Sequence, residues 1–493
     1  MKKIKKLLIL PVITLLALVL TGCSGGGSSS NTEKLTLYWW RVIGDAREET
    51  YEEIIKGFTS QNKSVEIKIV SKRPEVYEQE VLAALAAHQS VENAPDIISI
   101  PSEDLPRLLP QLTPAPNDLF DQGLSAKKKT GQTAVEYVRD NYEPIVGKTA
   151  VLNTAAGEPR LYGLPIAVDT LALYINRDLL EDTAEGIESS SRYTKDKSRE
   201  EIKEIAKKIQ TPPTTWEALA EIAPYLTVRD GETISRAGIS IGTSKNVERS
   251  YDILSSIMMQ NGTQLTDNNQ AAATFNQSQT GATTKSTPGE EALNFYLRFS
   301  NPSDPLYSWN ENMPNSVDAF MQGQLAILPH YASLYVYLIN EVPTLKRSIE
   351  VAPFPQITAK TNLAGAQGQV VTGRMNVFAA PSAKGDANRQ AASWAFIKYL
   401  TSKSGANPYL SAMKLPSALK EVDSKAKFDV FDEQKSIADT WYKGHRAMQV
   451  DQIFIAMIDD AYTGRKSVLD AINSAGTSVT TILQASNSKW STK

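Results

Sequence analysis

Residues Leu161–Leu180 read LYGLPIAVDTLALYINRDLL, an apolar run that is interrupted once, by Asp169 and Thr170, and then resumes. The β-branched and aromatic residues on both sides of the interruption predict a buried strand. A carboxylate buried without partners costs several kcal/mol or shifts its pKa. Either neighbouring groups satisfy this acid, or the chain reaches a surface here to meet another molecule.

The N-terminus predicts export and a lipid anchor. Lysines at positions 2, 3, 5 and 6 precede the apolar segment Leu7–Leu20, whose 14 residues suit a secretory signal and are too few for a membrane span. The segment ends at Cys23, the only cysteine of the chain, in a pattern that resembles a bacterial lipobox. We therefore expect a lipoprotein signal peptide over residues 1–22, a lipid on Cys23, and a flexible Gly/Ser tether over residues 23–32. The expected location is the extracytoplasmic face of the bacterial cell membrane.

Composition bounds the rest of the chain. Removal of residues 1–22 takes away four lysines and leaves 48 Lys and Arg against 55 Asp and Glu, a net charge of −7. This mild acidity argues against a nucleic-acid partner. The remaining 471 residues are too many for one hydrophobic core, so two or three domains are expected.

The first part of the mature chain alternates strand and helix patterns. Strands are expected at Lys34–Trp40, Val65–Val70 and Ile97–Ile100, with helices at Glu48–Ser60 and Val76–His88. This order predicts an α/β lobe with a largely parallel sheet.

Further along, helix patterns dominate. The charged segment Glu188–Gln210 reads as a helical surface insertion, and Thr214 with Glu217 reads as a capping box that starts the next helix. The chain closes with a helix over Ser467–Leu483.

Most catalytic chemistry is absent from the sequence. His88, His330 and His445 are scattered and give no metal-ligand spacing, and no phosphate-binding glycine motif is present. We therefore expect no metal site and no cofactor.

Two features of the sequence are compatible with a hydrolase. Residues Gly238–Gly242 match G-x-S-x-G, but the alternation through Ser240 favours a serine in a buried strand over a nucleophile elbow. A glycoside hydrolase needs two carboxylates, and no local pattern selects a pair among the 55 acids. Catalytic residues are therefore expected to be absent.

Several segments, in order along the chain, resemble the extracellular solute-binding proteins of ABC importers, specifically the maltose-binding-protein-like group of lipoprotein type. The segments that carry the resemblance are KLTLYWW, APDIISI, YGLPIAVDTLALYINRDLL, PPTTWEAL, AFMQGQLAI, VAPFPQ and ASWAFIKYL. The central one is the most specific, because the family has a similar apolar run broken by one acid. The resemblance implies a type II periplasmic-binding-protein-like fold, with two α/β lobes, a hinge and a ligand cleft between the lobes.

The resemblance also implies where the lobes divide. Lobe 1 would hold residues 33–168 and 348–402, and lobe 2 residues 172–346 and 403–493. The chain would cross between them near residues 168–173, 347 and 402.

Positions that match the family's ligand site are the first candidates for binding. Asp169 matches an acid that hydrogen-bonds sugar hydroxyls, and Trp39, Trp40 and Asp45 fall at the first ligand loop. Glu103 falls after the strand Ile97–Ile100, where another ligand acid of the family sits.

Aromatic positions depart from the family pattern. Tyr331 is the nearest candidate for an aromatic ligand contact, and Trp441 can replace a late tryptophan that the chain lacks near Asp451. Ile100 stands where the family has another tryptophan. These departures argue against identical maltodextrin specificity.

Side-chain chemistry also favours a carbohydrate ligand. A sugar offers C–H faces to aromatic rings and hydroxyls to acids and amides. Trp309, in the polar stretch Tyr307–Asn310, has such neighbours and joins the candidates, whereas Trp216 and Trp394 lie in amphipathic helices and are expected in the core. Because side chains alternate along a strand, only one of Trp39 and Trp40 is expected to reach a cleft.

The sequence thus predicts a monomeric, membrane-tethered binding protein. It would capture an extracellular solute, with carbohydrate as the expected class, by hinge closure and deliver it to ABC permease subunits. The alternatives are a lipoprotein hydrolase acting on a carbohydrate or ester, and a solute sensor that uses the same fold.

Overall fold

The first of two large sheets is built around β1 (Leu35–Val42), whose sequence LTLYWWRV alternates as expected, and β5 and β6 form a small third sheet. The computed structural model describes residues 34–43, 46–87, 91–121, 131–187, 189, 197–278, 286–358, 368–382, 386–421 and 429–488. In the first sheet the strands lie in the order β2-β1-β3-β14-β4, and β7 also pairs with β14. β1 runs parallel to β2 and β3, and β14 runs antiparallel to β3.

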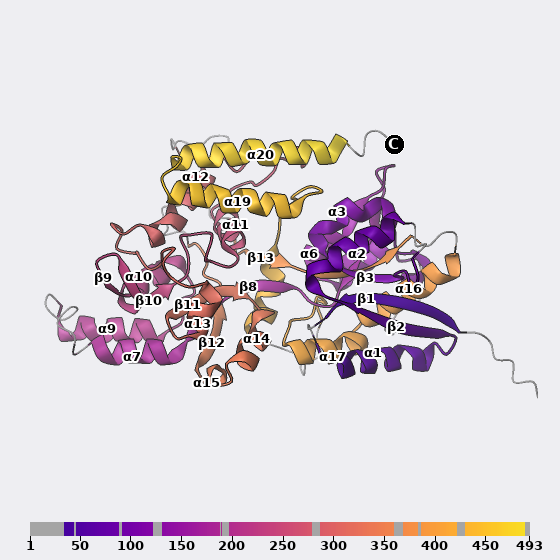
Figure 1. The fold of residues 1–493 in the computed structure, drawn as a ribbon, viewed down its shortest axis with the longest axis horizontal. Coiled ribbons are helices and arrows are strands. Elements are labelled where there is room, and N and C mark those ends of the chain that lie inside the picture. The colour runs from indigo at the N-terminus through magenta and orange to yellow at the C-terminus, as the bar shows by residue number, and fades with distance from the viewer. Residues whose placement is uncertain are drawn as a thin grey trace, which may run out of the picture.

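Lobe 1 is this sheet with its helices, and the strands and helices expected between residues 34 and 100 are confirmed, except that His88, the expected end of the second helix, lies outside the described residues. α1 and α17 cover one face of the sheet and α2 and α3 the other (Figure 1). Its elements are β1 (Leu35–Val42), α1 (Glu48–Gln61), β2 (Val65–Lys72), α2 (Pro74–Ala86), β3 (Ile97–Pro101), η1 (Ser102–Asp104), α3 (Leu105–Leu108), η2 (Leu109–Gln111), β4 (Leu112–Thr113), α4 (Asp118–Asp121), α5 (Ala134–Asn141), α6 (Pro144–Ala150), β5 (Val151–Asn153), β6 (Pro159–Leu161), β7 (Leu164–Pro165), β14 (Asn376–Pro381), α16 (Ala387–Leu400) and α17 (Lys403–Met413).

Lobe 2 is built around a second sheet, with strand order β15-β13-β8-β11-β10-β9 and β12 paired with β8. α19 and α20 lie along its upper side in Figure 1. Its elements are β8 (Asp169–Asn176), α7 (Arg177–Ile187), α9 (Arg199–Gln210), α10 (Trp216–Leu226), β9 (Val228–Asp230), β10 (Thr233–Ile239), α11 (Ser250–Gln260), α12 (Pro288–Leu297), η3 (Arg298–Ser300), α13 (Ser316–Met321), β11 (Leu325–Tyr331), α14 (Leu334–Glu341), α15 (Leu345–Ser348), β12 (Ile349–Pro353), β13 (Val371–Arg374), α18 (Asp429–Gln434), η5 (Lys435–Ile437), β15 (Ala438–Asp439), α19 (Ala447–Tyr462) and α20 (Val468–Ser488).

β8 explains the apolar run at the centre of the sequence. All eight of its residues are buried, because β11 pairs with one edge of the strand while β12 and β13 pair with the other. Strands buried on all sides read as nearly continuous hydrophobic runs. The polar pair Asp169–Thr170 sits at the start of β8, where the strand meets Arg374 and Gly373 of β13.

The chain passes from the first sheet to the second between Pro165 of β7 and Asp169 of β8, at the beginning of the crossing expected over residues 168–173. The second crossing, expected near 347, is displaced. β12 and β13 both pair with β8, so residues 349–374 belong to the second sheet and the chain returns to the first only at β14.

The third crossing, expected near 402, is displaced as well. α17 packs against α1 and α16 in lobe 1. Residues 416–418 then lie beside the first crossing, because the amide of Val168 donates to the carbonyl of Pro416 (3.3 Å) and the amide of Ala418 to that of Ile166 (2.9 Å). α18 and β15, further along, pack in lobe 2.

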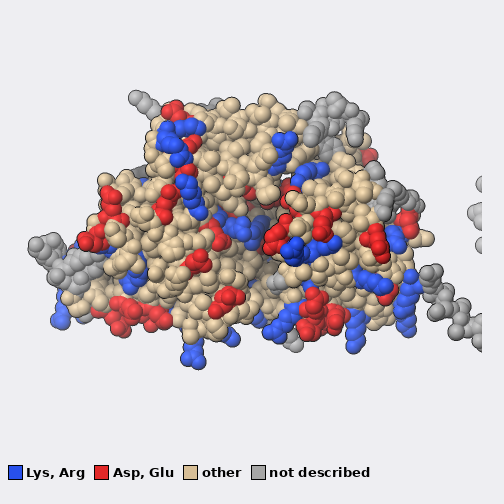
Figure 2. All heavy atoms as spheres, in the orientation of Figure 1, with Lys and Arg blue, Asp and Glu red and all other residues tan. Residues whose placement is uncertain are grey.

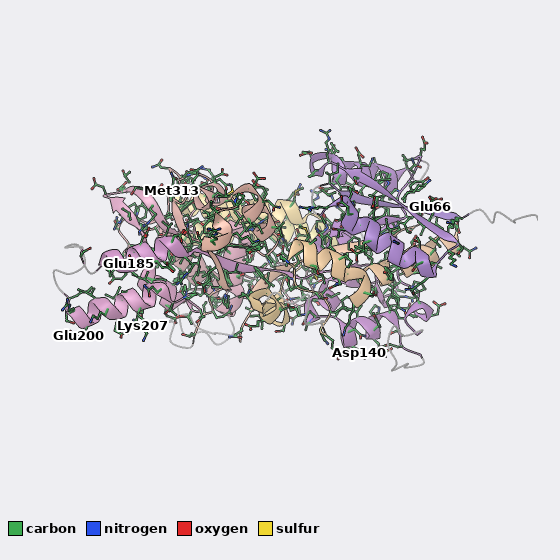
Figure 3. The ribbon with its side chains drawn as sticks, turned by 90° about the horizontal axis from the view of Figure 1, so that it is seen from below. Glu66, Asp140, Glu185, Glu200, Lys207 and Met313 are labelled. Atoms are coloured by element: carbon green, nitrogen blue, oxygen red, sulfur yellow. The ribbon has the colours of Figure 1, made fainter. Side chains whose placement is uncertain are left out.

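The expected insertion Glu188–Gln210 contains α9, which packs against α7 at the end of lobe 2 farthest from lobe 1. Figure 3 shows Glu185, Glu200 and Lys207 on this pair, at the opposite end from Glu66 and Asp140 of lobe 1. Ile202 and Ile209 are buried, and a capping box of Ser198 and Glu201 begins α9. Of the expected insertion, the structure describes residue 189 and residues 197–210, which include α9.

Other local predictions are confirmed, with small shifts in residue position. Thr215, one residue later than expected, caps α10 and accepts the amide of Ala218. Trp216 and Trp394 are core residues, 1% and 0% exposed, as predicted. In the described part of the chain, no helix is both long and apolar enough to cross a bilayer. The signal segment, Cys23 and the tether lie outside the described residues.

Candidate functional site: a cleft between the lobes

A cleft of about 930 Å³ opens between the two lobes, and both contribute to its walls. Figure 2 shows the hollow near the middle of the molecule, where basic and acidic side chains meet. Crossing residues Ile166, Ala167 and Met375 form part of the wall. Lobe 1 adds Trp39, Tyr51, Glu103, Phe378 and Tyr409, and lobe 2 adds Asp169, Tyr251, Ser333, Tyr337, Arg374, Trp441 and Lys443.

Two larger hollows lie elsewhere. One, of about 1020 Å³, is lined by α6, β15 and the end of α11, and no aromatic ring is among the described residues around it. The other, of about 1320 Å³, is confined to lobe 2 around α12 and Tyr307. The cleft differs from both because aromatic rings and charged groups from two lobes meet in it, which is typical of a small-molecule site.

Asp169 lies in the wall of the cleft, 8% exposed, and is fully partnered. Its Oδ1 accepts the amide of Ser333 (3.2 Å) and its Oδ2 accepts Nε of Arg374 (3.2 Å). Nη2 of Arg374 also donates to Oγ of Ser333 (2.9 Å). The carboxylate that interrupts the apolar run is therefore satisfied by neighbours and borders the cleft as well.

Trp39 and Trp40 face opposite sides of β1, as their alternation requires. Trp39 lines the cleft and packs edge-on against Tyr51, with ring centroids 5.4 Å apart. The Trp40 ring lies on the other face, where its Nε1 donates to the carbonyl of Asn93 (2.9 Å) and Nζ of Lys72 lies 4.3 Å from the ring. Trp40 does not line the cleft, so it is a structural residue in this arrangement.

Trp441 lines the cleft from lobe 2 and packs against Phe454, with ring centroids 5.4 Å apart. Its Nε1 has no hydrogen-bond partner in the described part of the chain, and the same holds for Nε1 of Trp39. A buried donor without an acceptor costs about 1–3 kcal/mol, so two such donors at the walls of one cleft are notable.

Two other candidates do not line the cleft, and a third is not described. Tyr331 is 1% exposed and lies behind the wall, with the guanidinium carbon of Arg374 4.1 Å from its ring centroid. Trp309 is a core residue of lobe 2, 0% exposed, and its Nε1 donates to Oδ1 of Asn246 (3.0 Å). Asp45 lies outside the described residues.

Glu103 joins the two lobes through Lys443. Nζ of Lys443, in lobe 2, lies 3.3 Å from Oε2 of Glu103 in lobe 1 and 2.6 Å from Oδ1 of Asp451. Burial alone would lower the pKa of Lys443, but Glu103, Asp451 and the buried Asp252 raise it above its ordinary value. Burial raises the pKa of Asp451 to about 6, although Lys443 opposes that shift.

Several cleft residues were not predicted from the sequence. Arg374 carries the same signal as Asp169, a charged residue between the apolar runs QVVTG and MNVFAA, and could have been found from it. Arg249, Tyr251 and Lys443 lie in polar segments without a comparable pattern. Only the folded chain brings them into the wall of the cleft.

The G-x-S-x-G residues Gly238–Gly242 do not form a nucleophile elbow. β10 ends at Ile239, α11 begins only at Ser250, and Ser240 is 1% exposed, so no strand-to-helix elbow presents it. Oγ of Ser240 has no hydrogen-bond partner among the described residues, and Nε2 of His330 is engaged by Glu248 (3.3 Å). The described part of the chain also holds no group of three residues suited to a metal ion.

Comparisons with known proteins agree with this geometry. The maltodextrin-binding protein MdxE of Bacillus subtilis is 27% identical over 184 residues, which is 37% of this chain and 37% of the relative, so the match spans little more than a third of that protein. Among solved structures, the sugar-binding protein MalE of Xanthomonas citri aligns with 93% of this chain and 100% of its own, with a TM-score of 0.66 and 17% identity. The GacH receptor of Streptomyces glaucescens aligns with 92% of this chain and 99% of its own, with a TM-score of 0.63 and 17% identity.

The structural likenesses confirm the predicted two-lobed, periplasmic-binding-protein-like fold. The family comparison is more direct, because it covers most of the chain. Residues 53–433 match the model of the bacterial extracellular solute-binding proteins, and this protein belongs to that family.

Proposed function

We propose that this protein captures an extracellular carbohydrate in the cleft between its lobes and delivers it to the permease of an ABC importer. The observation that carries the proposal is the cleft itself, in which Trp39 of lobe 1 faces the same space as Asp169 and Trp441 of lobe 2. Aromatic rings beside carboxylates and guanidinium groups suit a ligand with C–H faces and many hydroxyl groups.

Names of related proteins support the solute class. MdxE is described as maltodextrin-binding, MalE of Xanthomonas citri as sugar-binding, and the GacH receptor as a complex with acarbose. The cleft of this chain has its own charged groups, so the proposal extends to carbohydrate and not to maltodextrin in particular.

The proposed mechanism is hinge closure around the ligand. The hinge would consist of the crossing at residues 166–168, that at Met375, and the segment after Leu415. A ligand that contacts both lobes favours the closed state by the difference between its affinities for the closed and open states. No covalent step is involved, and we propose no enzymatic activity, metal or cofactor.

The proposed setting is the outer face of the cell membrane. There a lipid on Cys23 and the tether of residues 23–32 would hold a monomeric protein near the permease. A Cys23→Ala variant expressed in a bacterial host would then be released into the aqueous phase after detergent phase separation. Retention of that variant with the membrane would refute the lipid anchor.

Binding is tested by a thermal-shift screen against neutral and acidic oligosaccharides, polyols and peptides, followed by calorimetry. A ligand present at 100 times its Kd raises the unfolding free energy by about 2.7 kcal/mol. A Trp441→Ala variant serves as the control for binding in the cleft. Stabilisation by peptides alone would refute the carbohydrate class, and turnover of a bound sugar would favour the hydrolase alternative.

The sensor alternative shares the cleft and the ligand but needs no permease. Deletion of the neighbouring permease genes separates the two. Loss of uptake of the bound sugar supports delivery to an importer, whereas unchanged uptake with an altered transcriptional response supports a sensor.

A further inference from the structure

Two arginines of the lobe 2 wall lie against one buried aromatic ring. The guanidinium carbon of Arg374 is 4.1 Å from the ring centroid of Tyr331, and that of Arg249 is 5.7 Å from the same centroid. Both arginines line the cleft, and Tyr331 is 1% exposed behind them. Two cations gathered at one ring repel each other, and the repulsion is stronger in a partly dry cleft than in water.

The two arginines are not equally neutralised. Arg374 has the carboxylate of Asp169 at 3.2 Å. Arg249 has only a hydrogen bond from its Nη1 to Oη of Tyr251 (3.1 Å), and its buried Nε has no partner in the described part of the chain. Among the described residues, no carboxylate oxygen lies within 4.0 Å of a guanidinium nitrogen of Arg249, so Arg249 makes no ion pair there.

The acids around Arg249 either pair with other groups or lie buried outside the cleft wall. Glu248, its neighbour in sequence, is engaged by His330. Glu103 and Asp451 both contact Lys443. Asp252 is 7% exposed and lies outside the cleft wall, and its charge is shared among Lys443, Arg249 and Arg374. The carboxylate that acts on Arg249 therefore lies behind the wall, and the guanidinium group of Arg249 forms the wall itself.

The backbone at Arg249 adds to the positive potential at this wall of the cleft. Arg249 is the N-cap residue of α11, with a left-handed φ of 64°, and makes no side-chain cap. The N-terminus of a helix carries a partial positive charge and favours anions. A positive φ is unfavourable for a residue with a large side chain, so the backbone at Arg249 is strained.

Tyr251 connects this arginine to the next cation along the wall. Its hydroxyl bonds Arg249, and its ring centroid lies 5.5 Å from Nζ of Lys443. A ligand over this ring would have a cation on each side. Guanidinium groups in particular match carboxylates, sulfates and phosphates through paired N–H donors.

We propose that the ligand of this cleft is an anionic saccharide, and that Arg249 together with Arg374 receives its charged substituent. The substituent is a carboxylate, as in a uronic acid, or a sulfate or phosphate ester, which present similar acceptor oxygens. This inference rests on the proposed function and narrows it from carbohydrates in general to negatively charged ones.

The test is calorimetric titration of the wild-type protein with matched saccharides, at low and at physiological ionic strength. The probes are oligogalacturonates with their neutral methyl esters, mannuronate oligosaccharides, sulfated galactans with their desulfated forms, hexose phosphates, and neutral malto- and cello-oligosaccharides. We expect at least one acidic probe to bind about tenfold or more tightly than its neutral partner, and to weaken as salt rises. Whether the preferred probe carries a carboxylate or a sulfate or phosphate ester identifies the charged substituent.

Variants of Arg249 test whether this residue causes the preference for an acidic saccharide. Arg249→Gln is expected to reduce affinity for the acidic probe by about tenfold or more, and to reduce it clearly more than affinity for the matched neutral probe. Arg249→Lys keeps the charge and should recover part of the loss. Arg139→Gln removes an exposed arginine that pairs with Asp140, a residue at the far edge of lobe 1 in Figure 3, and should change nothing.

The outcomes separate this inference from the function on which it rests. Tight binding of neutral saccharides alone, or an Arg249→Gln variant that keeps its preference for the acidic probe, overturns the anionic ligand and leaves carbohydrate capture standing. Absence of binding to every saccharide, with a folded protein by circular dichroism, overturns the proposed function and the inference with it.

Discussion

Asp169 and Arg374 are register partners on β8 and β13, and their side chains form an ion pair with 3.2 Å between Oδ2 and Nε. Each residue stands where a strand of lobe 2 adjoins a segment that crosses to lobe 1. Asp169 follows the crossing at residues 166–168, and Arg374 precedes Met375. The pair thus ties two crossings together at the wall of the cleft, so ligand binding and lobe movement both act on it.

We predict that Asp169→Ala weakens ligand binding by about tenfold or more and leaves the protein folded. The side chain of Arg374 is 39% exposed, so it can be rehydrated when its partner is lost, and the destabilisation should stay near 1–2 kcal/mol. Calorimetry with the saccharide from the screen measures the affinity, and urea unfolding measures the stability. Unchanged affinity would remove Asp169 from the binding site.

The coupling between the two side chains is a separate prediction. If Asp169 mainly neutralises Arg374, then Arg374→Ala and Asp169→Ala should be non-additive in stability, with a coupling energy of about 0.5–1 kcal/mol. A double-mutant cycle by urea unfolding gives this energy. Full additivity would show that the carboxylate acts through Ser333 alone.

The tryptophans divide into cleft and core residues, which predicts opposite phenotypes. Trp441→Ala should reduce ligand affinity strongly, because its ring lines the cleft. Trp309→Ala should lower the unfolding free energy by about 3–5 kcal/mol, because the ring is fully buried in lobe 2, and affinity per folded molecule should be unchanged. Urea unfolding and titration of both variants compare the effects. A Trp309→Ala protein that is stable but does not bind would place Trp309 in the site.

Much of the fold was predictable because local patterns set it. The apolar run around Asp169 identified both a buried strand and a crossing, and the alternation in KLTLYWW correctly separated Trp39 from Trp40. The choice between those two rings was not predictable. Both rings are buried, with Trp39 1% and Trp40 4% exposed, and only the tertiary arrangement places Trp39 at the wall of the cleft.

The misplaced crossings have a physical cause. β12 and β13 are short, and the fact that both pair with β8 depends on contacts between segments about 180–200 residues apart, which no local pattern encodes. The cations of the cleft were missed for a similar reason. Arg249 and Lys443 gain significance only from Tyr251, which lies beside both in the folded chain.

Asp451 predicts a pH dependence of stability. Its pKa is raised from 3.8 to about 6 by burial, so between about pH 4 and 6 the folded protein binds more protons than the unfolded chain. Unfolding free energy should therefore fall as pH rises through this window, by about 1–3 kcal/mol from this group. Unfolding of the wild type and of Asp451→Asn across the window measures the contribution. The difference between them should shrink at the acidic end, and parallel profiles would contradict the assignment.

Arg249 predicts a conflict between stability and binding. Its φ of 64° is unfavourable for an arginine and ordinary for glycine, so Arg249→Gly should leave the unfolding free energy unchanged or raise it by up to about 1 kcal/mol. The same substitution removes the guanidinium and should abolish the preference for an acidic saccharide. Lys414→Gly is the matched control, because Lys414 has a φ of 55°, is exposed and does not line the cleft. It should match Arg249→Gly in stability and keep wild-type binding. If Arg249→Gly instead lost several kcal/mol, the arginine would be a structural support of α11, and its left-handed backbone would need no functional explanation.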